Sequence, residues 1–104
     1  MTIEFNNAYL QKLFEGKPVL GKPKYTNDVI VKFKKTVLML MNTDSIKELR
    51  KFRGLNFEAL KGDFKGYYSV RVDLKYRLIL RVEKDGTVLV TDVLIIEDLT
   101  NHYQ

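Results

Sequence analysis

The chain has 104 residues, a mass of 12.2 kDa and a formal net charge of +5 at pH 7. Domains usually hold about 100–150 residues, so we expect one domain, residues 1–104. The absence of cysteine excludes a disulfide framework, a thiolate zinc site and a cysteine nucleophile, and a single histidine excludes a two-histidine metal site in one chain. No apolar run has the roughly 20 residues of a membrane span and the first residues do not resemble a signal peptide, so we expect a cytoplasmic protein.

Positive charge is concentrated in the middle of the chain. Residues 61–84 contain seven Lys and Arg but only three acids, whereas residues 85–104 contain four acids and no Lys or Arg. A basic segment favours a polyanionic partner such as nucleic acid. A mildly basic, solvated surface is the alternative interpretation, because a net charge of about 2–8 is ordinary for a small domain.

The N-terminal quarter predicts a strand, a short helix and a loop. Ile3 and Phe5 alternate with polar neighbours, as residues of a strand do. Apolar residues at helical spacing then predict a helix over residues 8–14, which Gly16 should end. Residues 16–25 combine two glycines and two prolines with three lysines, which predicts a basic loop.

Two more helices are expected before the middle of the chain. A helix should begin near Thr26, because apolar residues then recur at spacings of three and four. A third, short helix is predicted over residues 45–51. The run over residues 37–41 is apolar nearly all round, so we expect this end of the second helix to be deeply buried.

The second half of the chain has the alternation of β-strands. Residues 67–73 and 75–82 alternate between apolar and polar, Asp85-Gly86 indicates a hairpin turn, and residues 88–96 suit a strand buried on both faces. This order predicts an α+β fold. We expect an N-terminal strand and two to three helices packed on a three- to four-stranded antiparallel meander sheet.

The same alternation predicts an arginine-rich sheet face. If the apolar residues of both strands face the helices, then Arg71, Arg77 and Arg81 share the opposite face. Neighbouring strands lie about 5 Å apart, so three guanidinium groups would converge there. Like charges this close need either internal acids, such as Asp73, Asp92 and Glu97, or an anionic ligand, and both interpretations remain open.

A glycine-containing turn precedes the first of these strands. Residues 61–66 contribute Lys61 and Lys65 but match no phosphate-binding glycine motif, so a plain turn is the alternative to a ligand-binding loop. Alternation leaves Tyr67 exposed, where its ring could stack on an unpaired base, and places Tyr68 and Tyr76 in the core.

The only histidine lies near the C-terminus. His102 suits general acid–base catalysis because the pKa of histidine lies near neutrality, and Asp98, four residues earlier, could orient the ring if the tail coils. A frayed surface residue is the alternative interpretation.

Two motifs carry a family resemblance. Residues 55–72 read LNFEALKGDFKGYYSVRV, and residues 76–78 read YRL. Together with Leu-Phe-Glu-Gly at residues 13–16, they resemble the RelE/ParE toxin superfamily, and most of all its HigB-like branch. The resemblance implies a compact α+β fold like that of microbial ribonucleases, and the toxin half of a type II toxin–antitoxin pair.

An activity follows from the same resemblance. It implies ribosome-dependent endoribonuclease cleavage of mRNA by attack of the ribose 2′-OH, without a metal or another cofactor. The implied partners are the ribosome, mRNA and a cognate antitoxin, with no membrane, and the assembly is a homodimer or a toxin–antitoxin heterotetramer. A gyrase-inhibiting, ParE-like toxin of the same fold and a plain binding module are the alternatives.

Site residues are carried over position by position. Lys61 matches the lysine of the family's Leu-Lys-Gly-Asp segment, Arg77 matches the arginine of its aromatic-Arg-Ile strand, and Asp98 matches the aspartate of its terminal Asp-Tyr-His. The catalytic candidates are Lys61, Arg77, Asp98 and His102, and the RNA-binding candidates are Lys65, Tyr67, Arg71, Arg81 and Tyr103.

The C-terminal motif of the family is altered in this chain. Leu99 stands where the tyrosine would be, and His102 and Tyr103 follow after a short insertion. Either this pair reaches the site from an extended tail, or the acid–base work falls to Lys61, to Glu58 or to a tyrosine.

Overall fold

The computed structural model describes residues 1–84 and 92–102. Three α-helices, two short 3-10 helices and five strands lie in this part of the chain, and none of its helices is long and apolar enough to cross a membrane. The α-helices are α1 (Ala8–Glu15), α2 (Asn27–Met41) and α3 (Ile46–Leu49), and the 3-10 helices are η1 (Arg53–Leu55) and η2 (Gly62–Phe64). The strands are β1 (Thr2–Phe5), β2 (Glu58–Ala59), β3 (Tyr68–Arg71), β4 (Arg77–Lys84) and β5 (Asp92–Thr100).

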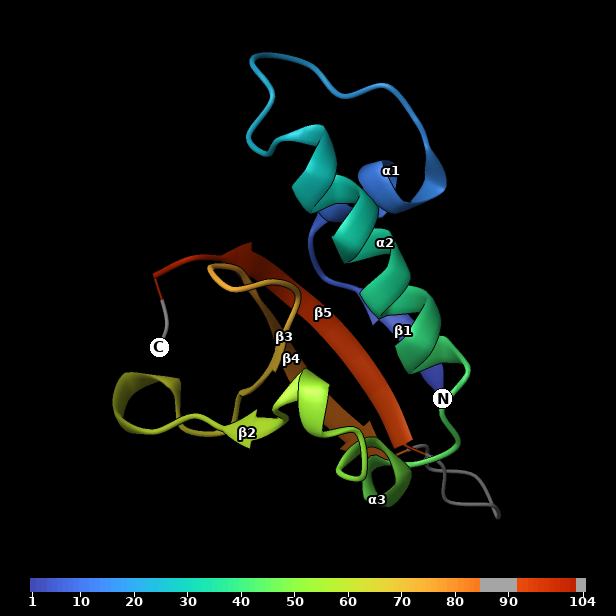
Figure 1. Cartoon of the computed structure of the whole chain (residues 1–104), viewed down its shortest axis with the longest axis vertical. Helices are drawn as coiled ribbons and strands as arrows, with labels where there is room; N and C mark the ends of the chain where they lie inside the picture. The colour runs from blue at the N-terminus through green and yellow to red at the C-terminus, as the bar shows by residue number, and fades with distance from the viewer. Residues whose placement is uncertain (85–91, 103–104) are drawn as a thin grey trace.

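The strands form one mixed sheet in the order β1-β5-β4-β3-β2 (Figure 1). The predicted α+β fold and its antiparallel meander are confirmed, since β2 to β5 pair antiparallel in chain order. The sheet differs from the prediction in having five strands, because β1 joins β5 in parallel, with Thr2 opposite Val93 and Phe5 opposite Ile96. Alternation over four residues indicates a strand, but it does not specify which other strand it pairs with.

Local signals set where the helices begin and end. The side chains of Asn7 and Thr26 accept hydrogen bonds from the backbone N–H of residues 10 and 29, which caps the first turns of α1 and α2. Gly16 ends α1 with a left-handed φ of 74°, a conformation that glycine adopts without steric cost. The predicted helix starts and the predicted end at residue 16 are therefore confirmed.

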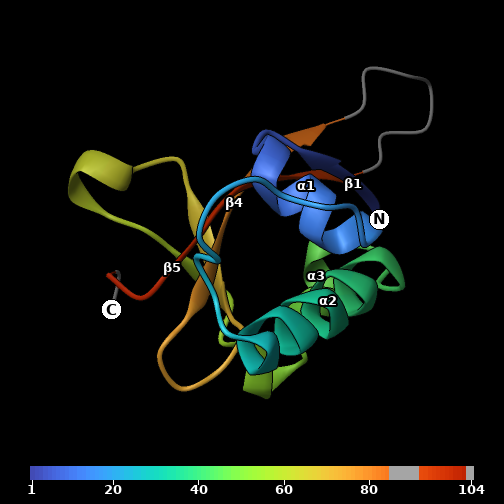
Figure 2. The ribbon, with the colours of Figure 1, turned by 90° about the horizontal axis from the view of Figure 1, so that it is seen from above.

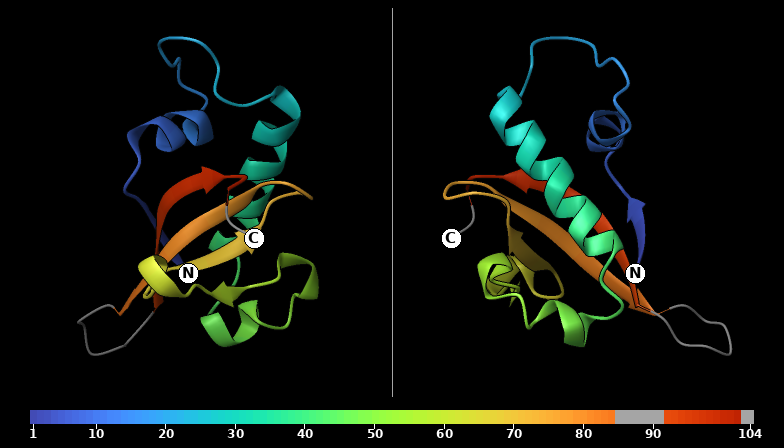
Figure 3. Two further views of the ribbon diagram at one scale, coloured as in Figure 1. Left: turned by 90° about the vertical axis from the view of Figure 1, so that its left-hand side faces the viewer. Right: turned by 45° about the vertical axis from the view of Figure 1, so that its right-hand side comes forward.

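The α-helices lie on one face of the sheet, and among the described residues only the short η2 lies over the other face (Figures 2 and 3). Phe33, Val37 and Leu40 of α2 are fully buried, and they belong to one core with the inward side chains of β3, β4 and β5. Residues 94–96 of β5 are all buried, as expected for a strand with neighbours on both sides, whereas the predicted turn at Asp85-Gly86 lies outside the described residues.

The predicted deep burial of residues 37–41 is wrong for three of the five. Leu38, Met39 and Met41 are 49%, 43% and 45% exposed, respectively. Helix α2 packs on the sheet with one face only, and none of the described residues forms a further layer over its outer face (Figure 3). An apolar run indicates burial only when there is structure on every side of the helix.

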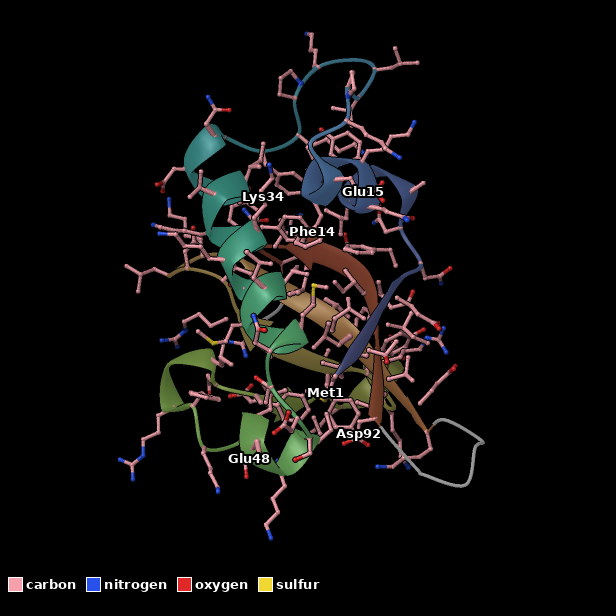
Figure 4. The ribbon with its side chains drawn as sticks, turned by 90° about the vertical axis from the view of Figure 1, so that its right-hand side faces the viewer. Met1, Phe14, Glu15, Lys34, Glu48 and Asp92 are labelled. Atoms are coloured by element: carbon pink, nitrogen blue, oxygen red, sulfur yellow. The ribbon has the colours of Figure 1, made fainter. Side chains whose placement is uncertain are left out.

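A polar corner holds the start of β1, the end of α2 and the start of β5 together (Figure 4). The Met1 ammonium donates to the carbonyls of Met41 and Thr43, and Asp92 accepts from the Ile46 N–H at 3.0 Å and pairs with Lys84. The hydrogen bonds from Lys84 and Ile46 hold the pKa of Asp92 below its usual range.

Candidate functional site

The open face of the sheet carries two arginines side by side. In the β3–β4 register Arg71 lies directly opposite Arg77, a pairing that brings Cβ atoms within about 4.5–5.5 Å. The two residues end β3 and begin β4, so they lie beside the turn that joins these strands. The expectation that these two arginines converge is confirmed.

Internal hydrogen bonds fix the position of the Arg77 side chain. Its Nε donates to Oγ of Ser69 at 2.9 Å, its Nη2 donates to the carbonyl of Asn56 at 2.8 Å, and Nη2 lies 3.9 Å from Oε2 of Glu58. Within the described residues no hydrogen bond engages Nη1. One edge of a rigid, buried guanidinium is therefore left without a protein partner from this part of the chain.

The electrostatic surroundings of Arg77 favour an anion. Burial is the main cause that lowers the pKa of Arg77, and the neighbouring charge of Arg71 lowers it further, while Glu58 opposes both. The side chain of Arg71 is exposed, and it makes no ion pair or hydrogen bond within residues 1–84 and 92–102. A bound anion would offset both the desolvation of Arg77 and its repulsion from Arg71.

A cavity of about 420 Å³ opens beside these arginines. Three of its lining residues are cationic and two are acidic, but the Asp73 carboxylate accepts the backbone N–H groups of Lys75 and Tyr76 at 2.8 and 2.6 Å and so serves the turn. The lining residues are Asn56, Glu58, Arg71, Asp73, Leu74, Lys75, Arg77 and Asn101. This arginine cavity is large enough for a phosphodiester and carries an excess of positive charge.

The third predicted arginine belongs to a different environment. Arg81 lies four residues beyond Arg77 on β4, about 13 Å along the strand. It donates to Oε1 of Glu97 at 2.5 Å and to Glu83 at 3.1 Å, and Asn6 donates to the other oxygen of Glu97 at 2.9 Å. The expected convergence of three guanidinium groups is therefore wrong for Arg81, because carboxylates of the chain itself neutralise it.

A second, smaller hollow of about 260 Å³ lies between η2 and the strands β4 and β5. It contains Asp98 and Tyr67, and its floor includes Ile79, which is two residues from Arg77 on β4. Alternation predicted that Tyr67 would be exposed, but its side chain is half-buried against Phe64. The expected packing of Tyr68 and Tyr76 against the core is confirmed. The lining residues are Asp63, Phe64, Tyr67, Ile79, Glu97 and Asp98.

A β-bulge brings Asp98 to this hollow. The register of β4 with β5 shifts between Ile79 and Leu80, which pair with Asp98 and Ile96, so Glu97 is the extra residue. Oδ1 of Asp98 accepts the Leu99 N–H at 2.8 Å. Bulges are difficult to read from one sequence, because a continuous apolar run does not mark the unpaired residue.

The lysines of the 61–66 turn lie outside both hollows. Lys61 directly precedes η2 and Lys65 directly follows it, and both side chains are exposed. Neither lines the arginine cavity or the smaller hollow, although Asp63, between them, does line the latter. Their predicted roles stay predictions.

The C-terminal residues approach the arginine cavity from the end of β5. Asn101 lines the cavity, and the exposed His102 follows it, with its backbone N–H bonded to Oγ1 of Thr100 at 3.1 Å. Within the described residues no hydrogen bond joins the His102 ring to Asp98. Tyr103 lies outside the described residues.

A tyrosine that the sequence did not single out anchors this end of β5. The Tyr25 hydroxyl donates to the carbonyl of Leu99 at 2.7 Å, and its ring packs edge-on against Tyr76 at 5.7 Å. Burial, together with the nearby charge of Asp98, raises the pKa of Tyr25 to about 12. Tyr25 therefore remains a protonated donor that holds the segment between Asp98 and His102 to the body of the protein.

Other members of the site were also missed. Ser69 and Asn56 hold Arg77, and Lys75 and Asn101 line the cavity. Ser69 could have been predicted from the sequence, because it lies two residues from Arg71 on β3 and therefore on the same face of the strand. The carbonyl of Asn56 could not, because only the tertiary structure brings the end of η1 next to β4. Among residues 1–84 and 92–102, no group of three or more His, Asp or Glu side chains could hold a metal ion.

The described chain thus combines helices packed on one face of a mixed sheet with an arginine cavity beside β3 and β4. Among solved structures, the YoeB/ParE toxin from Agrobacterium tumefaciens shares the fold, with 18% identity over 99% of this chain and 100% of that chain and a TM-score of 0.56. A family model described as the RelE-like toxin of the type II toxin–antitoxin system HigB matches residues 3–94. The chain belongs to this HigB-like toxin family.

Membership confirms the resemblance that the motifs predicted. The protein is a toxin of a type II toxin–antitoxin system, and its partner is an antitoxin. A search of curated proteins found no match.

Proposed function

We propose that this toxin is a ribosome-dependent mRNA endoribonuclease that cleaves by 2′-OH attack and needs no metal ion. The pairing of Arg71 with Arg77 beside a cavity of about 420 Å³ carries the proposal. Two guanidinium groups can bind the non-bridging oxygens of one phosphate, and they stabilise the extra negative charge that develops when phosphorus becomes five-coordinate.

The two arginines divide the work. Arg77 is held by Ser69 and the carbonyl of Asn56, so its orientation costs little further entropy when RNA binds. Arg71 is exposed and without an acidic partner in the described chain, so it is available to pair with the phosphate. Lys75 adds a third positive charge to the cavity.

Cleavage needs two proton transfers. A base takes the proton of the 2′-OH, the oxygen attacks phosphorus, and the P–O5′ bond breaks with its electron pair going to O5′, which an acid protonates. The products are a 2′,3′-cyclic phosphate and a 5′-hydroxyl. We assign these transfers to His102, which follows the cavity residue Asn101, and to Asp98, with Lys61 as the third candidate.

The test is cleavage of a defined mRNA on purified, programmed ribosomes, read by primer extension and by the chemistry of the new ends. The wild-type toxin should cut inside translated codons and leave cyclic phosphates. Arg77→Ala and His102→Ala should lose this activity, whereas Lys12→Ala, which removes an exposed positive charge on α1 far in sequence from the cavity, should retain it.

Other outcomes select the alternatives. Intact mRNA together with accumulating DNA breaks in cells would identify a gyrase-directed toxin of the same fold. RNA binding that is weak and insensitive to salt would indicate a plain binding module, because several phosphate contacts give a steep salt dependence.

A further inference from the structure

An apolar groove lies between the C-terminal half of α2 and η1, at the edge of the sheet where β3 ends. Its volume is about 520 Å³. Leu55 is buried in the groove, and Met39 and Phe52 are 43% and 47% exposed. The lining residues are Thr36, Met39, Lys51, Phe52, Arg53, Gly54, Leu55, Arg71 and Val72.

The exposed apolar surface of this groove requires an explanation. Met39 and Phe52 come from separate elements, and both leave nearly half of a large side chain in water. Exposed apolar patches with a polar rim mark protein interfaces, and Met and Phe are enriched at such interfaces. An unbranched methionine also adapts to the shape of a bound side chain.

All the charged residues that line the groove are basic. Lys51 pairs with Glu48 at 3.1 Å, but Arg53 and Arg71 have no ion pair within the described residues. The groove therefore complements a segment with an apolar stripe and acidic flanks, which is the pattern of an amphipathic helix laid into a groove.

We propose that this groove binds an acidic amphipathic segment of the antitoxin. The existence of an antitoxin follows from family membership, so this assignment does not depend on the nuclease proposal. The effect of antitoxin binding on catalysis, in contrast, rests on the nuclease proposal. Arg71 lines both the groove and the arginine cavity, so an acidic side chain at that end of the groove would pair with Arg71 and withdraw it from the phosphate.

The experiment measures how tightly toxin variants bind the cognate antitoxin. The antitoxin is identified as the protein whose coexpression restores growth to cells that produce this toxin. Dissociation constants are measured by biolayer interferometry for wild type, Met39→Asp, Phe52→Asp and Arg53→Glu. Val31→Asp is the matched control, because Val31 is a 51% exposed apolar residue of the same helix that does not line the groove. Thermal melts by circular dichroism verify that each variant folds.

We expect Met39→Asp and Phe52→Asp to weaken binding at least about tenfold, as interface hot spots do, and Val31→Asp to leave it unchanged. Arg53→Glu should weaken binding and reduce its salt dependence, because it removes an attraction for acids. The groove variants should still arrest growth when produced alone, and the antitoxin should no longer rescue the cells.

Three results would overturn the proposal. Folded Met39→Asp and Phe52→Asp that bind as tightly as wild type would remove the groove as a docking site. Equal weakening by Val31→Asp would show that the effect is not specific to the groove, and wild-type affinity of Arg53→Glu would exclude an acidic segment. Arg53 is exposed, so its variant stays informative if an apolar variant fails to fold. A toxin that cuts no mRNA would refute the proposed function and leave these affinities unaffected.

Discussion

Arg77 and Arg81 lie on the same strand and the same face of the sheet, yet they have opposite chemical environments. Arg81 is neutralised by Glu97 and Glu83, whereas Arg77 is held mainly by uncharged groups beside the unpaired Arg71. The comparison teaches that an arginine on a sheet face is available for a ligand only where no carboxylate of the chain lies within hydrogen-bond distance of its guanidinium group. The arginine at the Arg81 end of this face stabilises the fold, whereas the Arg77 end keeps a positive charge that the described chain does not neutralise.

The largest effect is expected at Arg77. Arg77→Ala should lower the rate of mRNA cleavage on ribosomes by about 10²–10³-fold, as the loss of a group that stabilises the transition state does. It should also lower the free energy of unfolding by about 1–3 kcal/mol, because the hydroxyl of Ser69 and the carbonyl of Asn56 lose their partner.

Arg77→Lys serves as the companion variant for that experiment. It keeps a positive charge but lacks the planar fork that makes two parallel hydrogen bonds. If folded Arg77→Lys or Arg77→Ala cleaves mRNA at the wild-type rate, Arg77 only stabilises the fold and takes no part in catalysis.

The next largest effect is expected at Arg71. Arg71→Ala should weaken binding of a single-stranded RNA about tenfold and reduce the slope of affinity against salt by about one phosphate contact. The melting temperature should not fall, because Arg71 has no ion pair or side-chain hydrogen bond within the described residues and its removal relieves its repulsion from Arg77. Fluorescence anisotropy at several salt concentrations gives both quantities, and an unchanged slope would count against a phosphate at Arg71.

Arg81→Ala should give the reverse pattern. The melting temperature should fall, because Glu97 is left partly buried with only the Asn6 hydrogen bond, while RNA affinity and cleavage should stay at wild-type values. Calorimetry and the ribosome assay separate the two. A strong loss of cleavage at full stability would place Arg81 back in the RNA-binding surface.

The smallest effect concerns pH. Burial opposes the ionisation of Glu97, but hydrogen bonds from Arg81 and Asn6 outweigh it and hold its pKa below the usual 4.5. A carboxyl group whose pKa is depressed by folding contributes stability above its unfolded pKa and loses it as pH falls through the folded value. The free energy of unfolding, measured between about pH 7 and pH 3, should therefore fall with decreasing pH, and it should fall less in Glu97→Gln than in the wild type. At neutral pH the Glu97→Gln substitution should lower the free energy of unfolding by about 1 kcal/mol. Identical acid profiles for the two proteins would contradict this assignment.

Much of the fold was predictable because it depends on short-range patterns. Helical spacing, asparagine and threonine caps and a glycine stop set both ends of α1 and the start of α2, and alternation indicated β3 and β4. The parallel pairing of β1 with β5 and the exposure of Leu38 and Met39 could not be read, because both depend on which layers meet in space.

The candidate site divides in the same way. Alternation identified Arg71 and Arg77 as neighbours on an open face, and a family motif marked the same two positions. The sequence by itself therefore determined the side of the sheet that each arginine takes, because side-chain direction in a strand follows a period of two. Only the tertiary structure decided that Glu97 neutralises Arg81 and that Asn56 orients Arg77, because such contacts join residues 16 and 21 positions apart that no local pattern relates.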